Sequence, residues 1–186
     1  MTAQNGRTAA PARDLVLALG SNLGDRIAHL QGAIGSLDGD GITITAVSGI
    51  FETAPVGGPE QDAYLNAVLT AESVLPAPEI LARCAAAEAA AGRVRTVRWG
   101  PRTLDVDIIT YGDLTSAGPD LTLPHPRAHE RPFVLVPWLD VDPAAALPGW
   151  GPVANLPAAA ATAGVHRRTE LRLVPPAPAS RAPGAR

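Results

Sequence analysis

The chain has 186 residues, a formal net charge of −3 and a hydrophobic content of 46%. This length favours one domain with its own core, which we expect at residues 14–174 between flexible tails at 1–13 and 175–186. The charge excludes the global basic field of a non-specific nucleic-acid binder, and no apolar run approaches the roughly 18 residues that cross a membrane. A single cysteine excludes an internal disulfide framework, and the polar N-terminal stretch predicts no secretory signal, so we expect a cytoplasmic protein.

The first half of the chain predicts strands and helices in alternation. The apolar run at 15–19 ends at a Gly-Ser-Asn turn and is typical of a buried strand. Asp25 is placed to cap a helix that ends near Leu37, and a break at 39–41 separates this helix from a β-branched strand at 42–51. A Pro- and Gly-rich loop at 53–60 leads to a strand at 64–73, and a helix at 78–91 ends before Gly92.

The second half holds one clear strand among shorter elements. A loop at 92–102 precedes a strand at 103–110, a turn at 112–120 and an extended stretch at 121–124. Residues 127–139 are expected to begin as a helical turn that Pro132 and Pro137 interrupt, followed by a helix within 153–164 and a strand at 169–174. The overall order indicates an α/β protein with a ferredoxin-like α+β sandwich, in which a mainly antiparallel sheet carries both main helices on one face.

Two acidic residues stand out in the strand at 103–110. Side chains alternate along a strand, so Asp105 and Asp107 point to the same face while Leu104, Val106 and Ile108 point to the other. Two carboxylates at this spacing can converge on a hard cation, and charges inside a β-branched run are expensive unless they are paired or bound to metal. The alternative is a solvated face of an edge strand.

Arginines crowd the loop directly before these aspartates. All 15 basic residues of the chain are arginines, and four of them are Arg93, Arg95, Arg98 and Arg102. Guanidinium groups suit phosphate, and an acidic strand beside such a loop suits a polyphosphate bound with Mg²⁺. Trp99 in the same loop predicts either a lid that closes over a bound nucleotide or a surface loop with one anchoring tryptophan.

A histidine between prolines gives a third candidate. His125 is followed by Arg127 and Arg131, which makes it a plausible phosphate ligand, although a lone histidine is more often a structural hydrogen-bonding group. His129 lacks this setting and is interpreted as exposed.

A fourth candidate site combines the loop at 53–57 with scarce aromatic residues. Loop backbone groups together with Asn66 can read the edge of a planar heterocycle, and Tyr64 or Phe133 can stack on its face. The alternative assigns both rings to the core. The run Gly-Ser-Asn-Leu-Gly-Asp at 20–25 lacks the Lys-Ser/Thr of a P-loop and is interpreted as a turn between strand and helix.

Taken together, four stretches between residues 15 and 143 resemble the 6-hydroxymethyl-7,8-dihydropterin pyrophosphokinase family. These stretches are LALGSNLGDR, FETAPVGGPEQDAYLNAV, GRVRTVRWGPRTLDVDIITYGD and LTLPHPRAHERPFVL, and they occur in the family's order. The resemblance implies a ferredoxin-like fold and a monomer that transfers the terminal diphosphate of ATP to the pterin hydroxymethyl group and releases AMP, a step of folate biosynthesis.

The resemblance also implies roles for individual residues. It implies catalysis by Arg93, Arg102, Asp105 and Asp107, of which the two aspartates hold two Mg²⁺ ions. It implies ATP contacts from Glu88, Arg93, Trp99, Arg102, the backbone near Ile108 and Thr122, His125 and Arg131. It implies pterin contacts from Thr53, the backbone of Val56, Tyr64, Asn66 and Phe133. A different Mg²⁺-dependent transferase and a non-catalytic ligand-binding module are the competing interpretations.

Overall fold

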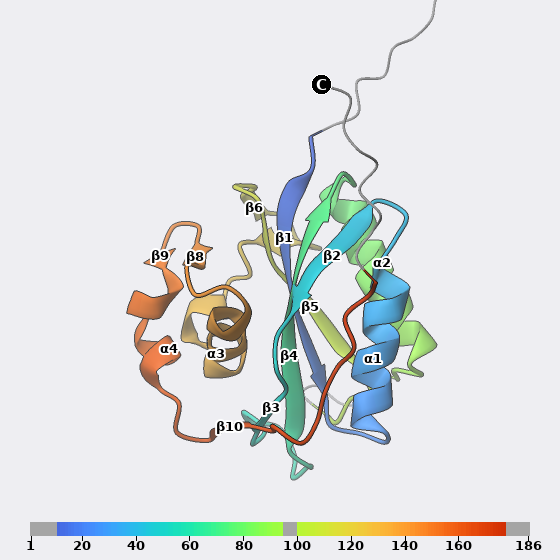
Figure 1. Ribbon diagram of the computed structural model, residues 1–186, viewed down its shortest axis with the longest axis vertical. Helices are drawn as coiled ribbons and strands as arrows, with labels where there is room; N and C mark the ends of the chain where they lie inside the picture. Colours follow the sequence, from blue (N-terminus) through green and yellow to red (C-terminus); the bar gives the residue numbers. More distant parts are fainter. Residues whose placement is uncertain (1–10, 95–99, 178–186) are drawn as a thin grey trace, which may run out of the picture.

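The computed structural model describes residues 11–94 and 100–177 (Figure 1). The larger elements are β1 (Arg13–Ser21), α1 (Arg26–Leu37), β2 (Ile42–Val47), β3 (Phe51–Thr53), β4 (Tyr64–Ser73), α2 (Ala77–Ala90), β5 (Asp105–Tyr111) and α3 (Pro132–Val141). The shorter ones are β6 (Ser116–Ala117), β7 (Thr122–Leu123), η1 (Ala128–Glu130), β8 (Ala146–Leu147), β9 (Gly151–Pro152), η2 (Val153–Asn155), α4 (Pro157–Ala160) and β10 (Val165–Arg167). In these ranges no helix has the length and apolarity needed to cross a bilayer.

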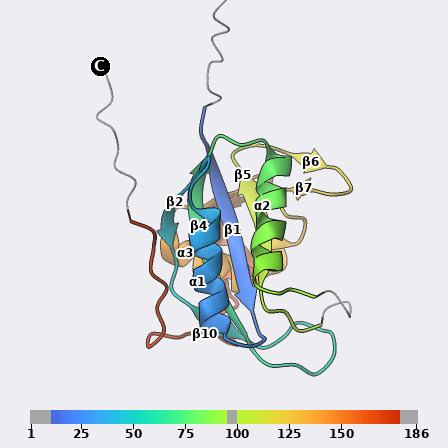
Figure 2. The same cartoon turned by 90° about the vertical axis from the view of Figure 1, so that its right-hand side faces the viewer.

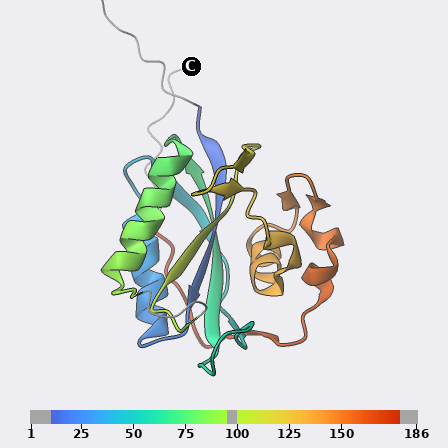
Figure 3. The same cartoon turned by 180° about the vertical axis from the view of Figure 1, so that it is seen from behind.

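One antiparallel sheet organises the molecule. Its strands lie in the order β10-β3-β4-β1-β5, and β2 pairs with β4 beside β3. The helices α1 and α2 lie side by side on one face of this sheet (Figure 2), whereas α3 and α4 lie on the opposite face (Figure 3). Each face has its own buried apolar cluster. This arrangement confirms the predicted ferredoxin-like sandwich with a mainly antiparallel sheet.

Local sequence explains the first helix well. The carboxylate of Asp25 accepts a hydrogen bond from the Ala28 N–H at 3.0 Å, as a helix N-cap does. Leu30, Ile34 and Leu37 are fully buried on the side of α1 that faces the sheet. The predicted cap and end of α1 are therefore confirmed.

The expected strand at 42–51 is wrong in one respect, because it is two strands. β2 pairs with β4 as far as Val47, and β3 resumes the pairing at Phe51. Between them, the Ser48 hydroxyl accepts a hydrogen bond from the Val68 N–H at 2.9 Å, and the Gly49 N–H donates to Asp140 of α3 at 2.8 Å. The break thus fastens the sheet to α3.

The expected interruption of the helix by Pro132 and Pro137 is wrong, because α3 is continuous from Pro132 to Val141. Pro132 begins the helix instead of interrupting it, because the first turn needs no N–H donor at this position. Pro137 lies inside the helix, where a missing hydrogen bond costs roughly 3 kcal/mol. Buried Val134, Leu135 and Trp138 hold α3 against the sheet, and their packing outweighs this cost.

The C-terminal part departs most from expectation. Residues 169–174 form no strand, and the last strand is instead β10, which pairs with β3. The expected helix within 153–164 is a turn of 3-10 helix, η2, followed by the four-residue α4. Leu171 and Leu173 nevertheless pack against the apolar cluster beneath α1 and α2. Apolar packing therefore places this segment without regular hydrogen bonding. At the other end, β1 already includes Arg13, which was expected to be loose.

Candidate active site

A cavity of about 470 Å³ opens among β1, β3, β4, β5 and the start of α3. Nine of the predicted site residues line it: Thr53, Val56, Tyr64, Asn66, Arg102, Asp105, Asp107, Arg131 and Phe133. These residues come from chain segments that lie up to 80 positions apart. Sheet pairing and α3 bring them to a common surface.

The register of the sheet sets the centre of the cavity. Gly20 of β1 pairs with Asn66 of β4 on one side and with Asp105 of β5 on the other. Since glycine has no side chain, the space in front of it stays open, and a Cβ there would come within 3.4 Å of the Asn66 side-chain oxygen. The two neighbouring side chains can therefore reach the same ligand.

The alternation predicted for β5 is confirmed. Asp105 and Asp107 both line the cavity, while Leu104, Val106 and Ile108 are buried in the cluster under α1 and α2. β5 lies at one edge of the sheet, as the competing interpretation assumed. Its acidic face is nevertheless partly covered, because the two carboxylate side chains are only 22% and 35% exposed and each is engaged by arginine.

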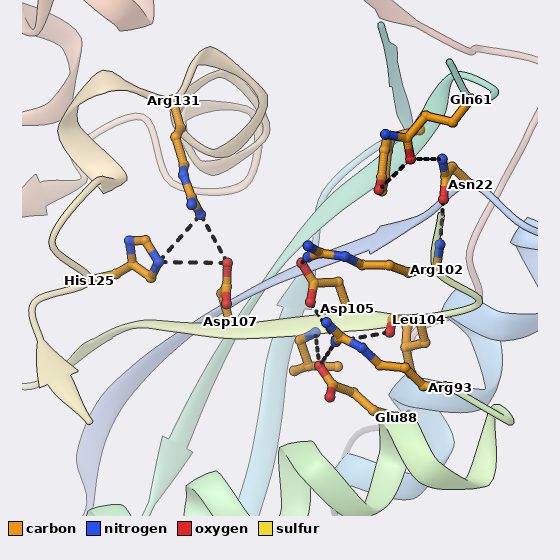
Figure 4. Close-up of polar contacts among 12 residues, drawn as sticks. Asn22, Gln61, Glu88, Arg93, Arg102, Leu104, Asp105, Asp107, His125 and Arg131 are labelled. Carbon is orange, nitrogen blue, oxygen red and sulfur yellow. Dashed lines mark hydrogen bonds and ion pairs between the residues drawn. The ribbon is translucent and has the colours of Figure 1, made fainter. Parts of the chain in front are cut away.

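Asp105 is held by two guanidinium groups (Figure 4). One of its oxygens accepts a hydrogen bond from Arg93 Nη1 at 2.5 Å and the other accepts from Arg102 Nη1 at 2.5 Å. Arg93 also donates to the buried Glu88, whose Oε1 accepts from the Val106 N–H at 3.0 Å. Glu88 thus ties α2 to the strand segment that lies between the two aspartates.

Asp107 has a separate set of partners. Its Oδ2 accepts from Arg131 Nη1 at 3.0 Å and lies 3.7 Å from His125 Nε2. Burial lowers the pKa of His125 below its ordinary value, and the nearby Arg131 charge lowers it further although Asp107 acts in the opposite direction. The imidazole is therefore held toward its neutral form beside a carboxylate and a guanidinium.

The other wall of the cavity is suited to a planar molecule. Asn66 Nδ2 donates to Thr53 Oγ1 at 2.9 Å, which fixes the orientation of a buried carboxamide. Tyr64 and Phe133 are half-buried and line the cavity, and Phe133 also packs against the apolar cluster on the α3 side of the sheet, as the competing interpretation expected. Burial raises the pKa of the Tyr64 phenol, which therefore stays protonated. Val56 lies at the rim and is 73% exposed.

The other predicted residues that the structure describes do not line this cavity; they are Glu88, Arg93, Ile108, Thr122 and His125. Ile108 is buried in the core, and Thr122 is exposed in β7. Arg95, Arg98 and Trp99 lie outside the described residues, so the lid expected there stays a prediction. Cys84, the single cysteine, is buried in α2, and burial raises its pKa to about 12. The interpretation of His129 as exposed is wrong, because its ring is half-buried and stacks on Trp150 with ring centroids 3.7 Å apart.

Asn22 is a residue that the sequence reading missed. It is 2% exposed, and its Oδ1 accepts from the Arg102 backbone N–H at 2.7 Å. Its Nδ2 donates to Gln61 Oε1 at 2.9 Å and to the Asp62 carbonyl at 3.0 Å. It joins the loop that follows β3 to the segment that carries Arg102 (Figure 4). Residues 22, 61 and 102 are far apart in the chain, so no local spacing indicated this junction.

Comparison with known proteins agrees with this geometry. The sequence model of the 7,8-dihydro-6-hydroxymethylpterin-pyrophosphokinase (HPPK) family matches residues 16–143. The chain belongs to this family. It is 49% identical over 143 residues to a 2-amino-4-hydroxy-6-hydroxymethyldihydropteridine pyrophosphokinase of Mycobacterium tuberculosis, covering 72% of this chain and 74% of that protein.

More distant proteins are also similar to this chain. The corresponding enzyme of Bacillus subtilis is 41% identical over 126 residues, covering 67% of this chain and 75% of that protein. Among solved structures, the wild-type HPPK-DHPS of Plasmodium falciparum with STZ-DHP superimposes with a TM-score of 0.62 at 12% identity. That match covers 80% of this chain and 43% of the longer Plasmodium chain, so it supports the fold.

Proposed function

We propose that this protein transfers the terminal diphosphate of ATP to the hydroxymethyl group of 6-hydroxymethyl-7,8-dihydropterin and releases AMP. The observation that carries the proposal is one cavity in which an aromatic and amide wall faces two carboxylates surrounded by arginines. A planar acceptor on the first wall would have its hydroxymethyl group directed toward a triphosphate on the second. Family membership supports the same reaction.

The pterin is proposed to lie between Tyr64 and Phe133. Two half-buried rings on opposite elements can stack on a flat heterocycle, and Arg131 lies 5.6 Å from the Phe133 ring centroid, where it adds positive charge to that wall. The hydrogen-bonded pair of Thr53 and Asn66 would read the ring edge, together with the backbone of Val56. These contacts determine orientation because buried polar groups discriminate strongly against a mismatched partner.

Two Mg²⁺ ions are proposed to bind at Asp105 and Asp107. Among residues 11–94 and 100–177, no group of three or more His, Cys, Asp or Glu side chains is arranged to hold a metal. That finding fits magnesium in this setting, because Mg²⁺ commonly binds one or two carboxylates and takes its other ligands from substrate phosphates and water. The ions, when bound, would neutralise phosphate charge and bring the phosphoryl group and the hydroxyl together.

The arginines are proposed to take over part of the phosphate charge. Arg93 and Arg102 both contact Asp105, and Arg131 contacts Asp107, so all three guanidinium groups would lie next to phosphates bound at the two aspartates. A guanidinium binds phosphate oxygens in a bidentate manner and stays charged at every relevant pH. Arg93 and Arg102 would therefore stabilise the charge that develops in the transition state.

The chemistry follows from positioning. The pterin hydroxymethyl oxygen attacks the β-phosphorus of ATP in line and releases its proton to solvent. The bond from the β-phosphorus to the oxygen bridging it to the α-phosphate breaks, and AMP leaves with that oxygen. Most of the acceleration should come from orientation and electrostatics, as in other phosphoryl transfers.

The further ATP contacts proposed are Glu88, Trp99, His125 and the backbone near Ile108 and Thr122. We also propose that the enzyme acts as a cytoplasmic monomer.

The test is a product analysis. Purified protein is incubated with ATP, Mg²⁺ and 6-hydroxymethyl-7,8-dihydropterin, and the nucleotides are separated by anion-exchange chromatography. We expect AMP and the pterin diphosphate in equal amounts. The 6-methyl analogue, which has no hydroxyl acceptor, serves as the control and should give no AMP. Formation of ADP would contradict diphosphate transfer.

A further inference from the structure

Glu52 lies directly behind the proposed pterin wall. It is the middle residue of β3, so its side chain points away from the face on which Phe51 and Thr53 are buried. Both of its carboxylate oxygens are engaged by arginines from distant segments. Arg26 of α1 lies 3.0 Å from Oε1, and Arg168, just after β10, contacts Oε2.

Each of the two arginines also holds a second segment. Arg26 Nη1 donates to the Ala63 carbonyl at 2.8 Å, at the end of the loop that leads into Tyr64. The Arg168 N–H donates to the Ile50 carbonyl at 2.8 Å, at the start of β3. The group formed by Arg26, Glu52 and Arg168, here called the ion triad, therefore fastens both sides of the loop between β3 and β4.

β10 supports the same place through the backbone. Val165 pairs with Thr53 on one side of β3, while Tyr64 pairs with Thr53 on the other. Without β10, the three-residue β3 would be an edge strand with one row of unpaired backbone groups. The C-terminal segment thus turns the strand that carries Thr53 into an interior strand.

The C-terminal segment is itself anchored along its length. Arg167 donates to Asp140 of α3 at 2.6 Å, and the Val174 backbone exchanges two hydrogen bonds of 3.0 and 2.7 Å with the side chain of Gln31 in α1. This segment lies beyond residue 143, where the match to the family model ends. It therefore connects α3, β3 and α1 with residues that the family pattern does not include.

We propose that the ion triad is a positioning device through which the C-terminal segment controls the affinity of the cavity for the pterin. This inference rests on the proposed function. Arg26, Glu52 and Arg168 touch no substrate, and they act by holding β3 and the end of the loop so that Thr53 and Tyr64 stay in place. ATP binding should be insensitive to them, because its proposed contacts lie on α2, the segment between α2 and β5, β5, β7 and the segment after β7, and the ion pairs of the triad reach none of these.

The test compares Arg168→Ala with Glu170→Gln. Arg168 forms ion pairs with Glu52 and with the exposed Glu170, so Glu170→Gln removes the second of these pairs and leaves the triad intact. We expect Arg168→Ala to raise the KM for the pterin about 5- to 10-fold and to leave the KM for ATP within about twofold of wild type. Glu170→Gln should change neither, and Arg168→Lys, which keeps the charge, should recover most of the pterin affinity.

Pterin binding provides a readout without turnover. Isothermal titration calorimetry with a non-hydrolysable ATP analogue should show the same loss of pterin affinity in Arg168→Ala, with thermal unfolding recorded in parallel. If Arg168→Ala does not fold, Glu52→Gln takes its place, since it keeps the side-chain volume. Unchanged pterin affinity, or an equal loss for pterin and ATP, would overturn the proposal. Absence of AMP from wild type would instead reject the proposed function, and the change in pterin affinity would still decide the role of the triad.

Discussion

Asn66 and Asp105 pair with the same residue, Gly20, from opposite sides of β1. Asn66, proposed to contact the edge of the pterin, and Asp105, proposed to bind Mg²⁺, are thus separated by one strand that has no side chain at that position. The donor and the acceptor of a transferred group need to be close together. Here the pairing register of three strands, and no loop, sets the distance between the two proposed binding regions. The missing side chain of Gly20 is therefore part of the site.

We predict that side chains at position 20 reduce activity without reducing stability. A Cβ there would meet the Asn66 oxygen at 3.4 Å and the Tyr64 ring at 3.6 Å, so alanine is tolerated with a tight fit and valine projects further into the cavity. Gly20→Val should lower kcat/KM for the pterin by about tenfold or more, and Gly20→Ala by less. Removing a strand glycine stabilises by about 0.5–1 kcal/mol, so thermal unfolding should show no loss in Gly20→Ala. Full activity of Gly20→Val would show that this space is not used.

Asp107→Asn should abolish most activity while the fold remains intact. The substitution keeps the shape of the side chain but removes the charge proposed to hold Mg²⁺, so turnover should fall by about 100-fold or more. Asp107 is 35% exposed in its ion pair with Arg131, so the stability cost should stay near or below about 1 kcal/mol. Steady-state turnover and thermal unfolding are the measurements. Asp113→Asn, an exposed carboxylate just beyond the same strand, is the matched control, and near-wild-type turnover of Asp107→Asn would refute the mechanism.

Asn22→Ala should impair both stability and turnover. The substitution removes the 2.7 Å acceptor of the Arg102 backbone N–H. It also removes the hydrogen bonds that Asn22 donates to Gln61 Oε1 and to the Asp62 carbonyl. An unpaired buried donor costs about 1–3 kcal/mol, and Arg102 would lose its fixed position beside Asp105. Urea unfolding and kcat should both report the change. Asn155→Ala, an exposed position in η2, is the comparison, and a loss of stability with unchanged kcat would contradict a role in placing Arg102.

Stability at acid pH should depend on Glu52. Partial burial raises its pKa, but the hydrogen bonds and charges of Arg26 and Arg168 prevail and lower the pKa below its ordinary value of 4.5. The folded protein therefore binds fewer protons at Glu52 than the unfolded chain in this range, and stability falls as pH drops below 4.5 through the folded-state pKa. Urea unfolding between about pH 6 and about pH 3 should show a steeper acid loss in wild type than in Glu52→Gln. If the free energy of unfolding falls equally with pH in wild type and in Glu52→Gln, the predicted contribution of Glu52 is contradicted.

The sequence by itself determined the local elements and the chemistry of single segments. Period-two alternation predicted that Asp105 and Asp107 share a face, and the structure agrees. The Asp25 cap, the strand Tyr64–Ser73 and the helix that ends before Gly92 follow from preferences that act over a few residues. Four stretches in the family's order together indicated the family, and one of them contains the two aspartates.

Tertiary structure alone decided the relations between distant segments. Local preference suggested one strand across 42–51, but contacts of Ser48 with β4 and of Gly49 with α3 divide it. A strand of three residues such as β10 has no periodicity to detect, and it exists because β3 offers an unpaired edge. Asn22 meets Arg102 across 80 residues, and Arg168 meets Glu52 across 116. Such contacts depend on the register of the whole sheet, which is set by the burial of its faces and not by any short stretch of sequence.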